Sequence, residues 1–385
     1  MKRKLLVTGS TFPRWENDTE PRFVLDLSEA LTKYFDVTVL VPASQGAKDE
    51  EDINDVKVIR YHYFPIYKFE TLCYPGAIVP RIREKKIRIL LVPFLLAALY
   101  FQLRKRVKAF DIIHAHWLIP QGIMQSFFKK PYIVTGHGGD ITSLNSGIIK
   151  KLKRRTLEKA SHITVVSKHL KNEVTKISSL RNIDIISMGC KTDNFDKHLR
   201  VENMFNQGSK KVILFVGRLA EKKGVKYLID AMKDIDALLV IVGGGPLEQQ
   251  LKERANIYSD KILFLGSKTH EELKVIYASA DVFVAPSVTA SDGDQEGFGL
   301  VILEAMASSL PIVANNSGGI TDLIKDGQNG LLAEEKNVSS LSEKINKLLT
   351  NDSYSKELGD KARKTAEEYD YKIIAAKYAE ILNKL

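Results

Sequence analysis

Short runs of apolar residues, each ending in a polar or glycine-rich turn, alternate along the chain with longer segments of helical apolar spacing. Residues 4–8 and 36–42 are two such runs, and residues 22–31 between them have the helical spacing. A strand–helix–strand order predicts a parallel sheet whose crossovers are helices. Further strands of this sheet are expected at residues 56–61, 111–117, 132–136 and 162–167.

The second half of the chain has the same pattern, although no sequence repeat relates it to the first half. Residues 197–210 are polar and turn-rich, and they are predicted to link a domain at 1–196 to a second at 210–370. Strands of the second domain are expected at residues 211–217, 237–242, 262–266, 282–286 and 311–314. The chain closes with a predicted amphipathic helix, 371–385, whose apolar face holds Ile374, Tyr378, Ile381, Leu382 and Leu385.

Composition is that of a folded chain with two ordinary domains, since 44% of its 385 residues are hydrophobic and 27% are charged. Its two cysteines, Cys73 and Cys190, favour a reducing compartment and argue against a disulfide framework. The basic residues 1–4 are followed by only three apolar residues, which is too short for a signal peptide. We therefore expect a cytoplasmic protein.

The net charge of +10 suits a solvated basic surface, nucleic acid, an anionic membrane or phosphorylated ligands. No nucleic-acid recognition motif accompanies the charge, so no nucleic-acid partner is expected. Basic clusters at 81–88 and 104–108 flank an apolar run, 89–103, which contains Pro93 and is shorter than the roughly 20 residues of a membrane span. We expect this run to be a buried helix covering a sheet. Its basic flanks keep a peripheral contact with an anionic membrane open.

The most informative stretch, residues 291–307, begins polar and glycine-rich and then becomes helical. Gly297 and Gly299 stand where the helix begins, and backbone N–H groups at a helix start suit a phosphate. Glu296 and Glu304 lie on either side, and carboxylates are good acceptors for sugar hydroxyls. The stretch therefore predicts a ligand that is both sugar and phosphate. Since one glutamate lies in the loop and the other within the helix, they are expected to hold different parts of that ligand rather than form one acid–base pair.

A second motif, residues 217–224, places Arg218 and Lys223 between a strand and a helix. A guanidinium and an ammonium together can neutralise a diphosphate and stabilise it as a leaving group. Basic surface residues are common, so this pair alone is a weak signal. Gly243 opens a glycine loop, 243–246, that permits close backbone approach but occurs in many folds.

In the first half, Gly9 follows the first strand, at the edge of a parallel sheet where ligands bind, although no G-x-G-x-x-G motif is present. His114, His116, His137 and Asp140 also fall at strand ends, on what should be the same edge. Histidines at such places are more often structural than catalytic, and His-x-His without a third ligand is a poor metal site. His137 differs because glycines flank it on both sides and expose the site.

Three motifs in order, G-R-L-x-x-x-K-G from 217, G-G-G-P from 243 and E-G-F-G-L-x-x-x-E-A-M-A from 296, resemble glycosyltransferase family 4, the retaining GT-B group. H-A-H-W-L-I-P-Q-G from 114 and H-G-G-D from 137 are similar to that family's acceptor-domain motifs. The resemblance spans essentially the whole chain. It implies an α/β GT-B fold of two Rossmann-like parallel-sheet domains facing each other across a cleft, with helix 371–385 crossing back to the first domain.

The resemblance also implies roles for residues of the second domain. Glu296 would hold the donor sugar hydroxyls and Glu304 the ribose hydroxyls, while Arg218 and Lys223 would bind the diphosphate. The backbone of three further residues would lie near the sugar and the phosphate: Phe298, Gly299 and Leu300. The implied partners are a nucleotide-diphosphate sugar as donor and a lipid-linked or cell-envelope glycan as acceptor.

From the first domain, the resemblance implies that Gly9 approaches the diphosphate and that His137 lies beside the donor sugar, near the reacting carbon. Retention usually suggests a carboxylate nucleophile, and Asp140 remains open for that role without being favoured. The family is thought to use a front-face displacement in which the leaving phosphate helps deprotonate the acceptor. No cofactor and no divalent metal is expected, because the family needs no metal and Arg218 and Lys223 already serve the leaving group. Residues 292–294 are formally D-x-D, but they lie inside the donor loop.

Two other functions would keep this fold. A nucleotide-sugar epimerase would hold several acidic groups at the sugar, and a phosphorylase often carries a pyridoxal lysine; neither signature is evident. The sequence departs from the family at residues 9–10, where Gly-Ser replaces a glycine pair, and at 186–190, where the family often has P-N-G-V. The donor base, the donor sugar and the acceptor cannot be derived from these motifs.

Overall fold

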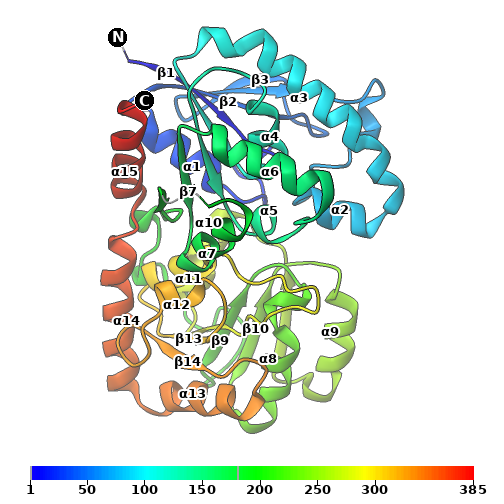
Figure 1. Cartoon of the computed structure of the whole chain (residues 1–385). Coiled ribbons are helices and arrows are strands. Elements are labelled where there is room, and N and C mark those ends of the chain that lie inside the picture. The colour runs from blue at the N-terminus through cyan, green and yellow to red at the C-terminus, as the bar shows by residue number, and fades with distance from the viewer. Residues whose placement is uncertain (1, 180–181) are drawn as a thin grey trace. The chain divides into compact units, whose positions relative to one another are not determined.

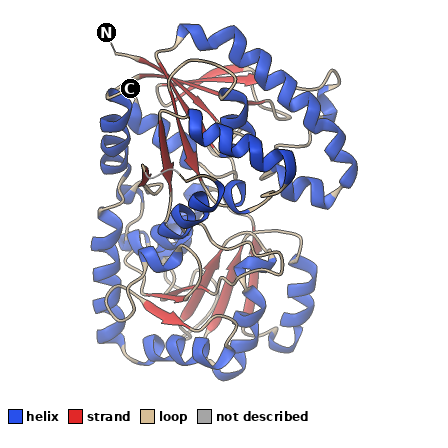
Figure 2. Ribbon diagram, in the orientation of Figure 1, coloured by secondary structure: helices blue, strands red, loops and turns tan. Residues whose placement is uncertain are grey.

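The computed structural model describes residues 2–179 and 182–385, which form two compact units. Unit 1 holds the chain up to Met188 and, at the end, Tyr371–Leu385, while unit 2 holds Gly189–Asp370. In each unit a parallel or mainly parallel sheet is covered by helices (Figures 1 and 2). The predicted α/β class with two parallel sheets is therefore confirmed.

Among the described residues, the sheet of unit 1 has eight strands in the order β3-β4-β2-β1-β5-β6-β7-β8, parallel except for the pair β3–β4. Its strands are β1 (Lys4–Thr8), β2 (Asp36–Pro42), β3 (Glu50–Ile53), β4 (Val56–Tyr61), β5 (Ile112–His116), β6 (Tyr132–Gly136), β7 (His162–Val165) and β8 (Ile183–Ile185). Its helices are α1 (Phe23–Leu31), α2 (Ile78–Glu84), α3 (Val92–Arg106), α4 (Ile123–Gln125), α5 (Gly139–Thr142), α6 (Gly147–Lys159), α7 (Lys168–Ile177) and α15 (Tyr371–Asn383).

The described sheet of unit 2 has six parallel strands in the order β11-β10-β9-β12-β13-β14. Its strands are β9 (Val212–Val216), β10 (Leu238–Val242), β11 (Ile262–Gly266), β12 (Val282–Ala285), β13 (Ile312–Asn315) and β14 (Leu331–Ala333). Its helices are α8 (Val225–Ala231), α9 (Glu248–Ala255), α10 (His270–Ala278), α11 (Leu300–Ala307), α12 (Ile320–Leu323), α13 (Val338–Thr350) and α14 (Asp352–Glu367). Every residue of β9 and β12 is buried, as continuous apolar runs in a parallel sheet predict.

The strand order reverses once in each unit. In unit 1 the reversal lies between β1 and β5, and in unit 2 it lies between β9 and β12. At such a point the loops leaving the two strands go to opposite sides and leave a crevice at their carboxyl ends, which is where ligands of open parallel sheets bind. The topology therefore identifies two places for function, one in each unit.

The boundary between the units differs from the predicted linker at 197–210. Residues 189–196 already belong to unit 2, since the hydroxyl of Thr192 donates to Asp370 Oδ2 over 2.6 Å. Arg200, inside the predicted linker, donates to Ala280 O at 3.0 Å. Residues 197–210 are thus polar because they form a surface segment of unit 2, and the boundary between the two units lies before them.

Helix α15 belongs to unit 1. The hydroxyl of Tyr371 donates to Phe23 O, 3.3 Å away, and the ring of Tyr378 packs against that of His114 with centroids 5.0 Å apart. Its buried residues are Tyr371, Ile374, Ala375, Tyr378, Ala379 and Leu382. The apolar face predicted for this helix is thus the face that it buries, although Ile381 and Leu385 are only half-buried.

The prediction of a buried helix at 89–103 is wrong. A 3-10 helix, η2 (Lys86–Leu91), leads into α3, of which only Leu95, Leu99 and Leu103 are buried. By length and composition alone, the segment Lys86–Ala109 could cross a membrane. Only 17% of its most apolar 18-residue stretch is buried in the protein. Apolar content did not reveal this, because it does not say which side of a helix packs on the protein.

Candidate functional site

Two loops leave the sheet of unit 2 at its switch point. Residues 217–224 follow β9, and residues 286–299 follow β12. The first loop contains the 3-10 helix η7 (Glu221–Lys223) and then enters α8. The second ends where α11 begins. Arg218, Lys223, Glu296 and the start of α11 are therefore all placed at the carboxyl edge of the same two neighbouring strands.

The loop after β10 packs backbone to backbone against the loop after β9. Gly217 N donates to Val242 O and Leu219 N donates to Gly244 O, both over 2.9 Å. Gly243 has φ +127°, and a Cβ there would lie 2.0 Å from Gly217 O. Glycine is thus required at 243 by the approach of one loop to another, and this packing fixes the backbone on which Arg218 stands.

The loops after β9 and β12 are bound to each other. The carboxylate of Glu221 accepts from Ser291 N at 3.0 Å and from Ser291 Oγ at 2.8 Å. Val288 N donates to Lys222 O over 2.8 Å. Gly224 has φ +64°, and a Cβ there would lie 1.8 Å from Pro286 O. The cations of η7 are therefore held at fixed positions relative to the loop that carries Glu296.

Two ion pairs join these loops. Lys223 Nζ donates to Glu296 Oε2, with side chains only 15% and 14% exposed. Lys222 Nζ lies 3.0 Å from Asp294 Oδ2. Burial by itself would raise the pKa of Glu296, but the charges of Lys223 and Lys222 and the hydrogen bond from Lys223 lower it to about 2. Glu296 is thus ionised at neutral pH, which suits a hydroxyl acceptor and excludes a proton donor.

The charge of Lys222 is also favoured by its surroundings. Burial lowers its pKa, but the charges of Glu296 and Asp294 outweigh burial, so that the pKa of Lys222 is raised. Both lysines of η7 therefore face the same acidic loop, and two ammonium groups lie together at this edge of the sheet.

Helix α11 begins directly after Gly299, which has φ +94° and provides no side-chain cap. The preceding Phe298 is buried, and its ring lies 5.6 Å from that of Tyr369. The carbonyl of Glu296 accepts from Gly319 N over 2.9 Å, and a Cβ at Gly318 would lie 2.6 Å from it. The loop after β13 thus supports the start of α11, where uncapped N–H groups suit an anion.

Glu304 lies in α11 and is engaged by two residues of α10. Tyr277 OH donates to Glu304 Oε2 over 2.9 Å, and His270 Nε2 lies 3.8 Å from Glu304 Oε1. Burial and the neighbouring charge of Glu304 raise the pKa of Tyr277 well above its usual range, so it remains a hydrogen-bond donor. The carboxylate of Glu304 is therefore oriented from α10, and it is held separately from that of Glu296.

The switch point of unit 1 carries an aromatic cluster. A Cβ at Gly9, after β1, would lie 3.4 Å from the ring of Trp117, after β5. That ring lies 4.9 Å from the ring of His137, which follows β6. His116 Nδ1 and His137 Nε2 are 2.9 Å apart and share a hydrogen bond. Burial lowers the pKa of His137 to about 3, so its imidazole is neutral at pH 7.

Asp140 has a structural place in this cluster. Its Oδ1 accepts from His137 N at 3.0 Å and from Gly138 N at 2.9 Å, and its Oδ2 accepts from Leu118 N at 2.8 Å. Both carboxylate oxygens are thus used to fix the loops after β5 and β6. This arrangement positions His137 through its backbone and accounts for the H-G-G-D motif.

The structure gathers Arg218, Lys223, Glu296 and the Phe298–Leu300 segment within unit 2, and Gly9 and His137 within unit 1. Sequence reasoning missed several partners that lie in helices or loops of ordinary composition: Lys222, Asp294, His270, Tyr277, Gly318 and Gly319. Two of these had a visible signal: Lys222 is the neighbour of a lysine already singled out, and Asp294 belongs to the D-x-D of the stretch 291–307. Across the described ranges 2–179 and 182–385, no group of three or more His, Cys, Asp or Glu side chains is placed to hold a metal ion.

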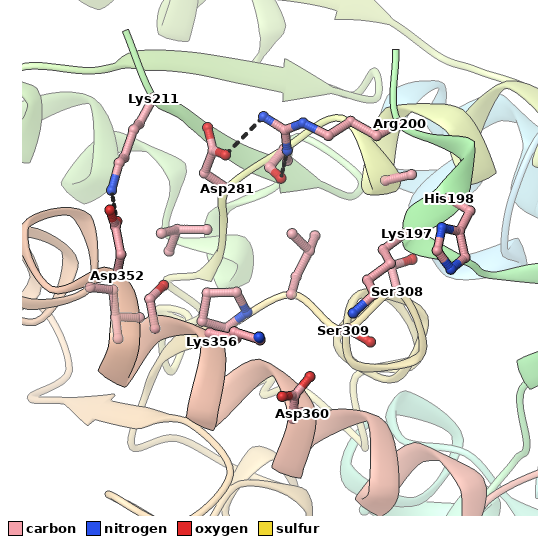
Figure 3. A pocket seen from close by; sticks show the side chains of 17 residues that line it. Lys197, His198, Arg200, Lys211, Asp281, Ser308, Ser309, Asp352, Lys356 and Asp360 are labelled. Carbon is pink, nitrogen blue, oxygen red and sulfur yellow. Dashed lines mark hydrogen bonds and ion pairs between the residues drawn. The ribbon is translucent and has the colours of Figure 1, made fainter. Parts of the chain in front are cut away.

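Unit 2 also has a cavity of about 430 Å³, which Figure 3 shows from close by. Lys211, Asp281 and Pro311 line it, and each immediately precedes a strand, so the cavity lies at the amino edge of the sheet. Arg200 pairs with Asp281 across 3.0 Å, and Lys211 pairs with Asp352. The cavity therefore lies at the edge opposite the switch-point loops.

Two family models match the chain. The model described as Glycosyltransferase Family 4 matches residues 21–194, and the model described as Glycosyl transferases group 1 matches residues 199–365. Together they cover nearly all of both units. The first match includes β5 but begins after β1, and the second includes both β9 and β12.

Relatives and solved structures agree with the family models. An uncharacterized glycosyltransferase of Methanocaldococcus jannaschii is 30% identical over 334 residues, covering 84% of this chain and 89% of its own length. The GDP-mannose-dependent alpha-(1-6)-phosphatidylinositol monomannoside mannosyltransferase of Mycobacterium tuberculosis is 28% identical over 264 residues, 65% of this chain and 69% of its own length. The structure of sucrose-phosphate synthase from Thermosynechococcus elongatus matches with a TM-score of 0.79 at 21% identity, covering 100% of this chain and 99% of the other.

Proposed function

The chain belongs to glycosyltransferase family 4 and is a group 1 glycosyltransferase of GT-B fold that uses nucleotide sugars; on that premise we propose a retaining transfer to a hydroxyl of a lipid-linked or cell-envelope glycan. The observation that carries this proposal is the meeting of Lys222, Lys223 and ionised Glu296 beside the uncapped start of α11. Two cations and a helix start suit a diphosphate, and an ionised carboxylate suits sugar hydroxyls.

Arg218 and Lys223 are proposed to bind the donor diphosphate and to stabilise it as the leaving group. The side chain of Lys223 is bound to Glu296 and shielded from solvent, so it is already in place before a donor arrives. We propose that a diphosphate oxygen takes over one of its three donor positions. Cations fixed in a partly water-excluded site act strongly on charge that develops as the glycosidic bond breaks.

The proposed step is a front-face displacement. The bond from the anomeric carbon to the leaving phosphate oxygen breaks, and a bond from that carbon to the acceptor oxygen forms on the same face. The proton of the acceptor hydroxyl passes to the leaving phosphate. Glu296 takes part by holding sugar hydroxyls, and Glu304, oriented by Tyr277, is proposed to hold the ribose hydroxyls. The backbone of Phe298, Gly299 and Leu300 is proposed to approach the sugar and the phosphate.

In unit 1, His137 is proposed to act as a neutral hydrogen-bonding group beside the donor sugar, and Gly9 to approach the diphosphate. The lowered pKa of His137 supports a neutral role rather than a cationic one. A covalent intermediate on Asp140 is not favoured, because three backbone N–H groups already occupy its carboxylate. Asp140→Asn should keep measurable transfer, whereas isolation of a glycosyl ester on Asp140 would establish the covalent route instead.

No cofactor or divalent metal is included in this proposal, since Arg218 and Lys223 supply the charge that a metal would supply. Transfer measured in excess EDTA should equal transfer in the presence of Mg²⁺ or Mn²⁺. Activity that disappears with EDTA and returns with one of these ions would show that a cation belongs to the donor complex.

A lipid-linked acceptor is supported by the name of the Mycobacterium tuberculosis relative, which describes transfer to a phosphatidylinositol mannoside. A place at the inner face of the cell membrane is proposed on the same ground. Cys73 and Cys190 are both buried and are not joined in a disulfide, which fits a reducing compartment. GDP-mannose is the first donor to test.

The proposed function is tested by a donor screen. UDP-, GDP- and ADP-sugars are incubated with the protein in the presence and absence of extracted membrane lipids, and the release of nucleoside diphosphate is followed. Acceptor-dependent release from one donor is expected. Conversion of the nucleotide sugar into an isomer without an acceptor would indicate an epimerase, and release that requires inorganic phosphate would indicate a phosphorylase.

A further inference from the structure

The segment from residue 81 to residue 108 concentrates the charge of the chain. It contains nine Lys and Arg residues and a single acidic residue, Glu84, so its net charge is +8 while the whole chain has +10. The cations stand in two groups at its ends: Arg81, Arg83, Lys85, Lys86 and Arg88 before the apolar run, and Arg104, Lys105, Arg106 and Lys108 after it. Glu84 accepts from both Arg81 and Arg88, and the segment contains no second carboxylate.

The apolar residues between these groups are largely exposed. Ile87 is 70% exposed, Leu90 62% and Phe101 64%, and Ile89 and Phe94 are also among the exposed residues. Within α3, Phe94, Ala97 and Phe101 follow one another at spacings of three and four, so they share one face. Leu95, Leu99 and Leu103, which are buried, lie on roughly the opposite face.

Other aromatic side chains extend the exposed surface. The ring of Phe64, from the loop after β4, lies 5.0 Å from that of Phe94 and 6.3 Å from that of Phe69, which is exposed. At the other end of α3, the ring of Tyr100 lies 6.4 Å from that of the exposed Phe127. Figure 1 shows α3, in cyan, along an outer side of unit 1, away from α15.

We propose that this basic-apolar face, defined by Ile87, Ile89, Leu90, Phe94 and Phe101 with the two groups of cations named above, docks unit 1 on the surface of an anionic lipid bilayer. An interfacial helix buries its apolar face at the boundary between headgroups and acyl chains, while basic residues at its ends contact anionic headgroups. The surface of an anionic bilayer binds exposed apolar side chains and the cations that flank them, and this face has both.

The buried face of the helix decides between docking and spanning. Leu95, Leu99 and Leu103 are the residues that α3 buries in unit 1. The helix contacts β4 and α4 there. A helix that crossed the bilayer would have to leave these contacts and carry one of the two basic groups through the hydrocarbon region. Lying along the surface preserves the packing and keeps both groups at the headgroups.

The charge also decides between a bilayer and a second copy of the chain. Two-fold pairing through the basic-apolar face would set the same face of each copy against the other. A segment of net charge +8 would then oppose an identical segment, which is unfavourable for association. An anionic bilayer supplies the opposite charge and an apolar phase together.

The test is sedimentation of the full-length protein with vesicles, without donor or acceptor. Vesicles of phosphatidylcholine alone are compared with vesicles that also contain about one third phosphatidylglycerol. Binding is expected only to the anionic vesicles, and it should weaken at least about tenfold between low and high salt. Equal binding to both vesicle types, or binding that does not change with salt, would contradict an electrostatic surface contact.

Two pairs of variants separate the apolar and basic contributions. Phe94→Glu with Phe101→Glu and Lys85→Glu with Lys105→Glu should each reduce vesicle binding at least about tenfold, while the circular dichroism spectrum stays that of the wild type. Lys233→Glu with Lys364→Glu, two exposed lysines of unit 2, is the charge-matched control and should bind vesicles as the wild type does apart from the overall change in charge. Variants of the face that bind as well as this control would overturn the proposal.

Two further outcomes would replace the bilayer-surface contact with another. Protein that resists extraction of membranes with alkaline carbonate would show that the segment spans the bilayer. A concentration-dependent dimer that is abolished by the Phe94 and Phe101 variants, without vesicle binding by the wild type, would show a contact between copies. Because vesicle binding needs no sugar donor, its result is independent of the proposed transfer.

Discussion

Lys223 and Glu296 form an ion pair although 73 positions separate them in the sequence. The pair joins the loop after β9 to the loop after β12, at the point where the strand order of unit 2 reverses. Both side chains are largely shielded from solvent, so each lowers the free-energy cost of burying the other's charge. The two residues expected to bind the diphosphate and the sugar are thus neighbours before any donor is present.

Replacement of Lys223 by Ala should reduce turnover by about 100-fold or more, the size of effect seen when a fixed donor to developing charge is removed. The circular dichroism spectrum should be unchanged, because Lys222 remains to offset Glu296. Steady-state rates at saturating donor provide the measurement. Lys233→Ala, an exposed lysine of the same unit, is the control and should keep wild-type turnover. An unchanged rate in Lys223→Ala would remove this lysine from the mechanism.

The stability of unit 2 should depend on the ionisation of Glu296. Its pKa is lowered from 4.5 to about 2, so the stabilisation is fully present above pH 4.5 and is lost as the pH falls toward 2. The shift corresponds to about 3 kcal/mol. Glu296→Gln lacks this term at every pH, so the difference in free energy of unfolding between the two proteins should shrink on acidification. Urea unfolding at pH 7, 4.5 and 3 measures it; a difference that stays constant with pH would contradict the pairing.

Two glycines allow backbone crowding to be separated from backbone strain. Gly243 and Gly266 both have positive φ, +127° and +66°, but only at Gly243 would a Cβ meet backbone, 2.0 Å from Gly217 O. Gly266→Ala should lower the free energy of unfolding by about 1 kcal/mol, the cost of a left-handed conformation. Gly243→Ala should cost about 1–3 kcal/mol more. Equal melting temperatures for the two variants would contradict the close packing of the loops.

Glu304 and Tyr277 should affect donor binding more than turnover. Glu304→Gln keeps the shape of the side chain but loses a charged acceptor, and the KM for the donor should rise about tenfold. Tyr277→Phe removes the hydroxyl that orients Glu304, and a smaller rise of about threefold is expected. Tyr258→Phe, in a 3-10 helix outside the site, is the control. A fall in kcat with an unchanged KM would place Glu304 at the reacting centre instead of at the ribose.

The strands and the donor motifs could be predicted because their signals are local. Residues 212–216 are buried throughout, so their sequence is a continuous apolar run. Gly299 directly precedes α11 and Glu304 lies within it. The change from a polar loop to apolar residues at helical spacing marks the start of this helix. The order of strands and helices then placed both at the ligand-binding edge of a parallel sheet.

The missing parts depend on contacts between distant segments. Tyr277 belongs to a helix of ordinary composition, and only the fold brings its hydroxyl to Glu304. Residues 197–210 are polar for reasons of exposure, which composition cannot distinguish from a linker. The apolar run that includes Phe94 and Phe101 predicted a helix correctly, but not that this helix buries only one narrow face.

The central claim, that the switch point of unit 2 binds a nucleotide-diphosphate sugar through Arg218 and Lys223, is tested most directly by calorimetric titration. UDP, GDP and ADP are titrated into the wild type and into an Arg218→Ala, Lys223→Ala double variant. One nucleotide should bind the wild type at a single site, and the double variant should bind it at least about tenfold more weakly. Absence of binding by the wild type to all three, or equal affinity in the double variant, would contradict the account.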